Sequence, residues 1–321
     1  MLKYYGYRAL SGICGFLPRR LQYAISHRIA DLHYLCDGAA RRHAMATMRA
    51  ILGPCVSESK VRREARWVFR SFGMYLCEFM GQRRFGPAFI DKHVEVRGRE
   101  HLDAALARGR GAILCTAHYS SWELGGPIVA HMKYPITVLT LMHPDPRINA
   151  LFVELRASRG VKVVHSQSGA RAVLKTLRQN ETVAIVADRT TGGPVTGVKL
   201  FGRHASLPQG PWRIAHVSGA ALLPTFVSRR FNNDYVLEIG APIGMSDGSR
   251  DENMAAMAQA WAGCLEARVR ADPCQWAVFR PMWDDDSSVA DTKIVSRAVR
   301  PEPRKIGRDE RNTIEHLEEH A

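Results

Sequence analysis

Between residues 94 and 283 the chain alternates short apolar runs with longer amphipathic segments, and this alternation restricts its fold more than any other feature. The apolar runs have the length of β-strands, and the segments between them have the length of helices. Strands are expected near Val94–Val96 and at 111–117, 136–141, 161–164, 183–187, 221–227 and 235–240. Helices are expected at 101–108, 120–132, 146–158, 168–179, 209–218 and 251–270. This alternation predicts an α/β fold, in which helices flank a mixed, mostly parallel sheet.

Two regions of different character lie on either side of this α/β core, which is expected at 91–283. Residues 1–90 are expected to be mainly helical, and their segment 62–79 places its apolar residues on one helical face. Residues 284–321 are dense in mixed charge, poor in apolar residues and contain Pro301 and Pro303. Such a tail is expected to be disordered.

The charge is strongly positive everywhere except in the tail. The whole chain carries a net charge of +14, and because its last 38 residues hold 7 basic and 10 acidic side chains, residues 1–283 carry +17. A body this basic indicates an anionic partner, either an anionic membrane surface or nucleic acid. Nucleic acid is the less favoured partner, because no helix-turn-helix, RNA-recognition or zinc motif is present and the basic residues are scattered.

The N-terminal segment favours contact with a membrane surface. No apolar run reaches 18 residues, so no membrane-spanning helix is expected, and no signal-peptide core is evident. Residues 2–35 instead mix aliphatic and aromatic residues with five cations. This pattern suits one or two helices lying on anionic lipid. The alternative is that these helices pack on the core while their arginines face water.

The seven cysteines are scattered, without a Cys-x-x-Cys pair or a His/Cys cluster of zinc spacing. They indicate free thiols in a reducing, cytoplasmic setting. Cys115 lies in an expected strand and is interpreted as a core residue rather than a nucleophile. No metal site and no cofactor are expected.

The segment Thr116–Glu123 places a histidine, His118, five residues before a carboxylate, Glu123, and directly after the apolar run 111–115. On a single helix the two side chains would point about 140° apart and would not meet. If the strand ends near Ala117 and a helix begins near Ser120, the carboxylate can reach the imidazole. A histidine oriented by a carboxylate at the end of a strand is a candidate general base.

A purely structural interpretation fits the same residues. Ser120-x-x-Glu123 has the spacing of a capping box, in which the serine and the glutamate satisfy the free amides of a helix start. Glu123 would then be only a cap, and His118 only a loop residue. The spacing alone leaves both interpretations open.

The pattern His118-x4-Glu123, with Trp122 before the acid, resembles the signature of the lysophospholipid acyltransferase superfamily. More narrowly, it resembles the bacterial lipid A lauroyl/myristoyl acyltransferase family, which includes phosphatidylinositol mannoside acyltransferases. Further blocks resemble that family in the expected order, namely Arg156–Gly160, Val183–Arg189, Gly197–Gly202, Ala221–Pro224 and Gln275-Trp276. The chain departs from the family at Ala117 and Ser121, where the family often has asparagine, and at Leu200, where it usually has phenylalanine.

The resemblance implies transfer of a fatty acyl group from a thioester, on acyl carrier protein or coenzyme A, to a hydroxyl of a glycolipid. A lipid A precursor is the favoured acceptor. Alternative acceptors are a phosphatidylinositol mannoside, a lysophospholipid or an aminolipid, and a non-catalytic basic protein that binds lipid or nucleic acid is a further alternative. The implied location is peripheral, at the cytoplasmic face of the inner (plasma) membrane.

The resemblance also assigns roles to residues. His118 is expected to take the hydroxyl proton, and Glu123 to orient its ring. Arg156 and Arg159 are expected to bind phosphate groups of the acceptor, because the arginine fork suits two phosphate oxygens; solvated arginines at a helix end are the alternative. Asp188 and Arg189 complete the substrate-binding set, by pairing with each other or by holding another arginine.

Overall fold

The computed structural model describes residues 2–166, 169–190, 192–244 and 248–283. Seven strands form one sheet in the order β1-β9-β8-β2-β5-β3-β4. Their bounds are β1 Val94–Arg97, β2 Ala112–Thr116, β3 Ile136–Thr140, β4 Val161–His165, β5 Thr182–Val186, β8 Ala221–Arg229 and β9 Tyr235–Ile239. All neighbours pair in parallel except β8 and β9. The mixed, mostly parallel sheet predicted from the sequence is confirmed, whereas the tail 284–321 lies outside the described residues.

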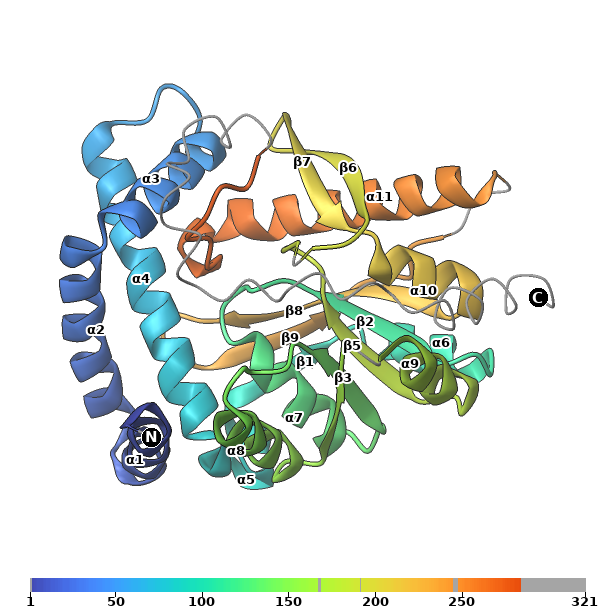
Figure 1. Cartoon of the computed structure of the whole chain (residues 1–321), viewed down its shortest axis with the longest axis horizontal. Helices are drawn as coiled ribbons and strands as arrows, with labels where there is room; N and C mark the ends of the chain where they lie inside the picture. Colours follow the sequence, from blue (N-terminus) through green and yellow to red (C-terminus); the bar gives the residue numbers. More distant parts are fainter. Residues whose placement is uncertain (1, 167–168, 191, 245–247, 284–321) are drawn as a thin grey trace.

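Helices cover both faces of the sheet. The central strand β2 is apolar throughout because both of its faces are covered. Ile113 and Cys115 belong to the core that also contains side chains of α9 (Gly169–Arg178), α10 (Gly210–Ser218) and α11 (Arg250–Ala271). Ala112 and Leu114 belong to the opposite core, with α5 (Pro87–His93), α6 (Arg99–Ala107) and α7 (Gly125–His131). Figure 1 shows α10 and α11 on one side of the sheet and α5 and α7 on the other. A strand buried on both faces needs no polar alternation.

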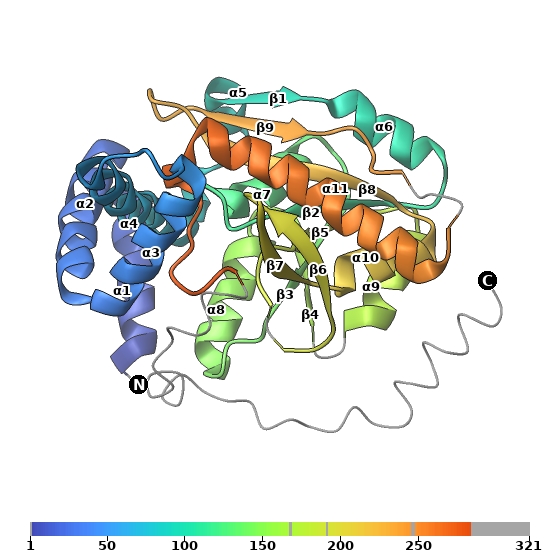
Figure 2. The same ribbon diagram turned by 90° about the horizontal axis from the view of Figure 1, so that it is seen from above.

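The helical character expected for residues 1–90 is confirmed. Helices α1 (Leu2–Phe16), α2 (Arg19–Cys36), α3 (Gly38–Leu52) and α4 (Glu58–Met80) gather at one end of the sheet (Figures 1 and 2). On the outside of α1 and α2, nine large apolar side chains are exposed: Tyr5, Leu10, Ile13, Phe16, Leu21, Ile25, Ile29, Leu32 and Leu35. Among the residues that the structure describes, no helix combines the length and hydropathy needed to cross a membrane.

The structure differs from the sequence prediction just after β2. The helix expected at 120–132 is instead a short 3-10 turn, η2 (Trp122–Leu124), followed by α7. Ser120 has a φ of 52°, in the left-handed region, and therefore cannot begin a right-handed helix. This backbone turn lets residues 117–121 run as a loop across the end of the sheet. The next helix, α8 (Pro146–Ala157), lies close to the expected bounds.

A β-hairpin that the strand prediction did not include packs over α11. Its strands are β6 (Val195–Leu200) and β7 (Arg203–Pro208), which pair antiparallel. Phe201 and Gly202 form the connection with φ values of 53° and 77°, the geometry of a two-residue hairpin turn. The alternation that buries Val198 and Leu200 was present in the sequence, but it lies on one short, half-exposed strand.

Candidate active site

His118 and Asp188 meet because the strands that precede them are neighbours in register. In the parallel pair of β2 and β5, Thr116 lies opposite Val186, so the residues two positions further on also lie opposite each other. The Nδ1 atom of His118 is 2.7 Å from Oδ1 of Asp188, and the backbone N–H of His118 donates to Oδ2 at 3.1 Å. The carboxyl ends of adjacent parallel strands thus place a histidine on a carboxylate.

Asp188 is buried and accepts a third hydrogen bond, from the indole Nε1 of Trp276 at 2.9 Å. Burial alone would raise the pKa of Asp188, but the charge and hydrogen bond of His118 and the charge of Arg189 outweigh it and hold the pKa well below its usual value. An ionised carboxylate only accepts hydrogen bonds, so the hydrogen of this contact resides on Nδ1 of His118. Nε2 is then the ring nitrogen with a lone pair, and it can take a proton.

The backbone around His118 is held by the segment that follows α11. The carbonyl of His118 accepts from the N–H of Ala277 at 2.9 Å, and the N–H of Ser120 donates to the carbonyl of Gln275 at 2.7 Å. Tyr119 and Trp276 form an isolated antiparallel bridge between these bonds. The loop is therefore fixed on both sides, as a precise catalytic geometry requires.

The carboxylate in contact with His118 is not the one expected from the sequence. Glu123 forms a bidentate ion pair with Arg156, whose Nε lies 2.9 Å and whose Nη2 lies 2.5 Å from its two oxygens. The hydrogen bond that the ring of His118 was expected to donate to Glu123 is instead donated to Asp188, because η2 turns Glu123 toward α8. The capping box is also not formed, since the hydroxyl of Ser120 accepts from the backbone N–H of Arg229.

The two arginines assigned to phosphate lie in different surroundings. Arg156, at the end of α8, is neutralised by Glu123 and lies over the ring of Phe79 at 4.9 Å. Arg159 donates from Nε to the carbonyl of Gln82 at 2.9 Å. Burial, followed by the charge of Arg83, lowers the pKa of Arg159. The two guanidinium groups therefore do not form one shared fork.

Asp188 and Arg189 do not pair as expected. Both oxygens of Asp188 are engaged by His118 and Trp276, and the guanidinium of Arg189 donates to the carbonyl of Ala277. Burial lowers the pKa of Arg189, although the charge of Asp188 partly opposes it. Arg189 thus lies beside the segment that holds His118.

A mostly apolar pocket lies between α7 and the sheet, and its empty space is about 670 Å³ including the mouth. Its walls are aliphatic residues of the strands, including Leu114, Val138, Ala184 and Val227. Trp122, Glu123 and Arg156 also line it, and the ring of Trp122 contacts that of His118 edge to face at 4.9 Å between centroids. An apolar chain in this pocket would therefore lie close to the His118–Asp188 pair.

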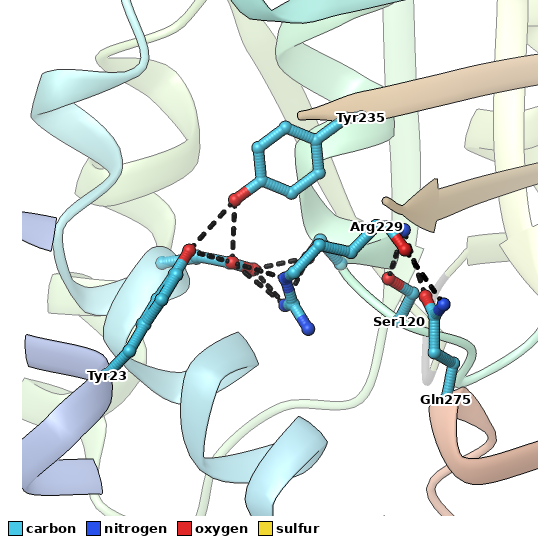
Figure 3. Close-up of polar contacts among 7 residues, drawn as sticks. Tyr23, Ser120, Arg229, Tyr235 and Gln275 are labelled. Carbon is cyan, nitrogen blue, oxygen red and sulfur yellow. Dashed lines mark hydrogen bonds and ion pairs between the residues drawn. The ribbon is translucent and has the colours of Figure 1, made fainter. Parts of the chain in front are cut away.

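Behind the same loop lies a buried ion pair between Glu78 of α4 and Arg229 at the end of β8. Nε of Arg229 lies 3.0 Å and Nη2 lies 2.8 Å from Oε1 of Glu78. The hydroxyls of Tyr23 and Tyr235 also donate to that oxygen, at 2.5 and 2.7 Å. Figure 3 shows Arg229 extending toward Tyr23 and Tyr235, while Ser120 and Gln275 lie at its backbone.

This ion pair also holds the candidate catalytic loop, residues 117–121, through the side chain of Ser121. The hydroxyl of Ser121 donates to Glu78, and Nη2 of Arg229 donates to that hydroxyl at 2.7 Å. Burial would raise the pKa of Glu78, but the charge of Arg229 outweighs it and the pKa is lowered. Since every charge here has several partners, the desolvation cost is largely offset. Helix α2, through Tyr23, and helix α4 are thereby connected to residues 120–121.

Sequence reasoning missed several of these residues. Trp276 entered only through the resemblance, without a role as a donor to Asp188. Glu78 could have been noticed as an acid among the apolar residues Tyr75 and Phe79 on a buried helix face, and Arg229 as a cation closing an apolar strand. Their pairing could not, because it joins residues 151 positions apart.

Comparison with known proteins finds relatives that are named as acyltransferases. The phosphatidylinositol mannoside acyltransferase of Mycobacterium tuberculosis is 29% identical over 200 residues, which cover 60% of this chain and 61% of the relative. The lipid A biosynthesis lauroyltransferase of Escherichia coli is 32% identical over 181 residues, 55% of this chain and 58% of the relative. The chain thus spans about three fifths of the length of these curated relatives.

A family model covers nearly all of the residues that form the fold and the site. The model of bacterial lipid A biosynthesis acyltransferases matches residues 1–285, from the first helix to just beyond the core. This range includes His118, Glu123 and Asp188 as well as the helices that hold Tyr23 and Glu78. The match extends over far more than half of the chain, and the protein therefore belongs to the bacterial lipid A biosynthesis acyltransferase family.

Proposed function

We propose that this protein transfers a fatty acyl group from an acyl thioester to a hydroxyl of a glycolipid, with His118 as the general base. The observation that carries the proposal is the 2.7 Å contact between Nδ1 of His118 and the buried Asp188, next to an apolar pocket. Family membership supports the reaction class. The donor carrier is acyl carrier protein or coenzyme A, both of which are anionic and suit a body with a net charge of +17.

The reaction follows from the protonation state of the histidine. Nε2 of His118 takes the proton of the acceptor hydroxyl as its oxygen attacks the thioester carbonyl carbon. Asp188 stabilises the imidazolium that forms and keeps its ring in place, the role that the sequence had assigned to Glu123. As the new C–O bond forms and the C–S bond breaks, His118 returns the proton to the leaving thiolate. No acyl-enzyme and no metal or cofactor is needed in this scheme.

Glu123 has a positioning role in this proposal. Its ion pair with Arg156 lies at the pocket, at the end where Trp122 faces His118. The pair holds the polar end of the pocket in shape, so that an acyl chain lying among Leu114, Val138 and Ala184 presents its thioester to His118. Preorganisation of this kind lowers the barrier without a direct contact to the reacting atoms.

The acceptor is proposed to be a glycolipid of the lipid A precursor type. The family supports this choice, whereas the name of the mycobacterial relative favours a phosphatidylinositol mannoside as the second candidate acceptor. Labelled acyl thioester incubated with lipid A precursors, mannosylated phosphoinositides, lysophospholipids and aminolipids would separate these acceptors. The labelled product, identified by mass, names the lipid.

The protein is proposed to act at the cytoplasmic face of the inner membrane, bound through α1 and α2. The exposed side chains Leu21, Ile25, Ile29, Leu32 and Leu35 recur at three- and four-residue intervals on α2 and so share one face. Cations on the same helices favour anionic lipid. Contiguous exposed apolar faces of this kind are typical of membrane or protein contacts.

The catalytic proposal is tested by thioester turnover. The full chain in detergent is given lauroyl and palmitoyl thioesters of carrier protein and of coenzyme A, together with the acceptor panel. Substitution of His118 by Ala is expected to reduce acceptor-dependent thiol release by about 10³-fold or more, since general base catalysis contributes 10²–10⁴-fold. His93→Ala, which alters a half-buried histidine that also contacts an aspartate, is the matched control. Undiminished transfer by His118→Ala would exclude this mechanism.

Membrane binding is tested separately by flotation with vesicles of phosphatidylethanolamine and phosphatidylglycerol. The double variant Ile25→Glu/Ile29→Glu is expected to stay with the soluble fraction, because two charges replace apolar contacts. Val195→Glu, at an exposed aliphatic position on the β6–β7 hairpin, is the control and should float like the wild type. Flotation of the double variant at wild-type levels would refute the role of α2.

A further inference from the structure

Two arginines beside the His118–Asp188 pair reach across to each other's backbone segments. Arg189 follows Asp188 and donates to the carbonyl of Ala277. Arg280 lies three residues beyond Ala277 and donates from Nη1 to the carbonyl of Thr190 at 3.3 Å. The two guanidinium groups therefore lie along one seam, between the end of β5 and the segment after α11. Burial and the nearby charge of Arg189 lower the pKa of Arg280.

This seam holds more positive than negative charge. Among the residues that the structure describes, Arg189 and Arg280 form no ion pair within 4 Å, in contrast to Arg156, which has Glu123. Asp188 is the near carboxylate, but its oxygens already accept three hydrogen bonds. Two like charges brought together beside a candidate active site are stabilised when an anion binds between them.

We propose that Arg189 and Arg280 bind a phosphate group of a substrate, next to the reacting hydroxyl and thioester. Each guanidinium has five N–H donors and spends few of them on a carbonyl, so both retain forks that match phosphate oxygens. Arg189 is half-buried and Arg280 is exposed, which leaves the seam open to a ligand. This proposal assigns the phosphate site to Arg189 and Arg280, whereas the resemblance implied Arg156 and Arg159.

The identification of the substrate that carries the phosphate rests on the proposed acyl transfer. The backbone of His118 is bonded to Ala277, whose carbonyl binds Arg189, so the seam lies close to the base. In a donor thioester the phosphate is separated from the sulfur by the whole pantetheine arm. An acceptor with a phosphate a few bonds from its hydroxyl fits the short separation better. The shared chemistry in both cases is a phosphate ester.

Direct binding tests the site without any turnover. Line broadening of the ³¹P signal of inorganic phosphate is measured with the wild type, Arg189→Gln, Arg280→Gln and Arg108→Gln. Arg108 is an exposed arginine just after α6 and serves as the matched control. We expect each of the first two substitutions to abolish most of the broadening and the control to preserve it. Equal broadening by all four proteins would overturn the proposal.

Kinetics then identify the source of the phosphate. KM of the wild type, Arg189→Gln and Arg280→Gln is measured for an acceptor before and after phosphatase treatment. It is also measured for lauroyl thioesters of pantetheine with and without its 4′-phosphate. Each substitution removes a charge-assisted hydrogen bond and is expected to raise KM about 10- to 100-fold for the phosphorylated acceptor alone. A rise only for the phosphorylated donor supports the site with the donor as ligand, and no rise for either refutes a phosphate role in the reaction.

The two experiments fail independently of each other. If Arg280→Gln loses phosphate binding while no donor and acceptor give turnover, the anion site stands and the proposed reaction fails. Arg280→Lys adds a further criterion, since lysine keeps the charge but not the fork. Partial recovery of phosphate binding by this variant is expected, and complete recovery would argue against bidentate recognition.

Discussion

His118 and His93 each contact an aspartate at the same distance, yet only the first pair has the surroundings of a catalytic site. His118 lies 2.7 Å from Asp188, and His93 lies 2.7 Å from Asp234. The histidine side chains are similarly exposed, at 23% and 26%, but Asp188 is 0% exposed and Asp234 is 30% exposed. The environment of the carboxylate, rather than the His–Asp distance, therefore separates the two sites.

The surroundings of the carboxylates explain this difference. Asp188 accepts from the ring and the backbone of His118 and from Trp276, all within the core. Asp234 lies in the turn before β9, and its other side-chain partner is Asn232 of the same turn. A buried carboxylate with several donors cannot rotate away, whereas an exposed one exchanges its partner for water.

The largest expected effect on activity comes from removing the carboxylate of Asp188, and removal of the carboxylate of Asp234 is the comparison. Asp188→Asn should lower kcat by up to about 10⁴-fold, because the amide no longer fixes the tautomer of His118 or stabilises its charged form. Asp234→Asn should leave kcat within about twofold, since exposed ion pairs contribute little. Comparable losses in the two variants would show that the comparison is mistaken.

A second prediction separates Glu123 from Asp188. Glu123→Gln should lower activity about 10- to 100-fold through loss of charge-assisted bonds to Arg156. Arg156→Gln should have a similar effect, and the double variant should be little worse than either single one, since the two residues form one unit. If Glu123 instead oriented His118, its loss would shift the pH–rate profile and would not couple to Arg156.

Trp276→Phe should have a smaller effect, about two- to tenfold on kcat, because it removes one neutral donor from Asp188 and keeps an aromatic ring. The pH–rate profile is measured alongside kcat for this variant. Trp212→Phe, which changes a buried tryptophan on α10, controls for general loss of packing. Equal effects of the two substitutions would leave the indole without a specific role.

The smallest effect concerns stability in acid. The pKa of Asp188 is lowered in the folded state, so its contribution is fully present above the unfolded value of about 4 and is lost as pH falls toward the folded value. The free energy of unfolding is measured with denaturant from pH 6 down to pH 3. As the pH falls, the difference in this free energy between wild type and Asp188→Asn is expected to shrink by on the order of 1 kcal/mol. The corresponding difference for Asp234→Asn, at an exposed site, should shrink less. A difference independent of pH would contradict the lowered pKa.

The strands of the seven-stranded sheet could be predicted because each is a separate apolar run, and helical segments lie between most of them. His118 could be singled out because it follows such a run directly. Its true partner could have been inferred from register, since Asp188 also follows a strand end, but the sequence does not state that β2 and β5 are neighbours. Glu123 was favoured because it is local, and the backbone turn at Ser120 removes it from reach.

Other parts were beyond sequence reasoning for a different reason. Glu78 and Arg229 are 151 positions apart, and only the packing of α4 against the end of β8 brings them together. Arg189 and Arg280 likewise meet only where the chain returns after α11. Hydrophobic periodicity locates elements, whereas a polar cluster of this kind depends on which ends of those elements meet.

The outward face of α1 and α2 has a practical consequence for handling the protein. Nine large apolar side chains lie uncovered on two adjacent helices, from Tyr5 to Leu35. In plain aqueous buffer, two copies can bury these surfaces against each other, and the driving force grows with the apolar area removed from water. Self-association that rises with concentration and disappears in mild detergent is therefore the expected behaviour in solution, so detergent should be present from the first purification step.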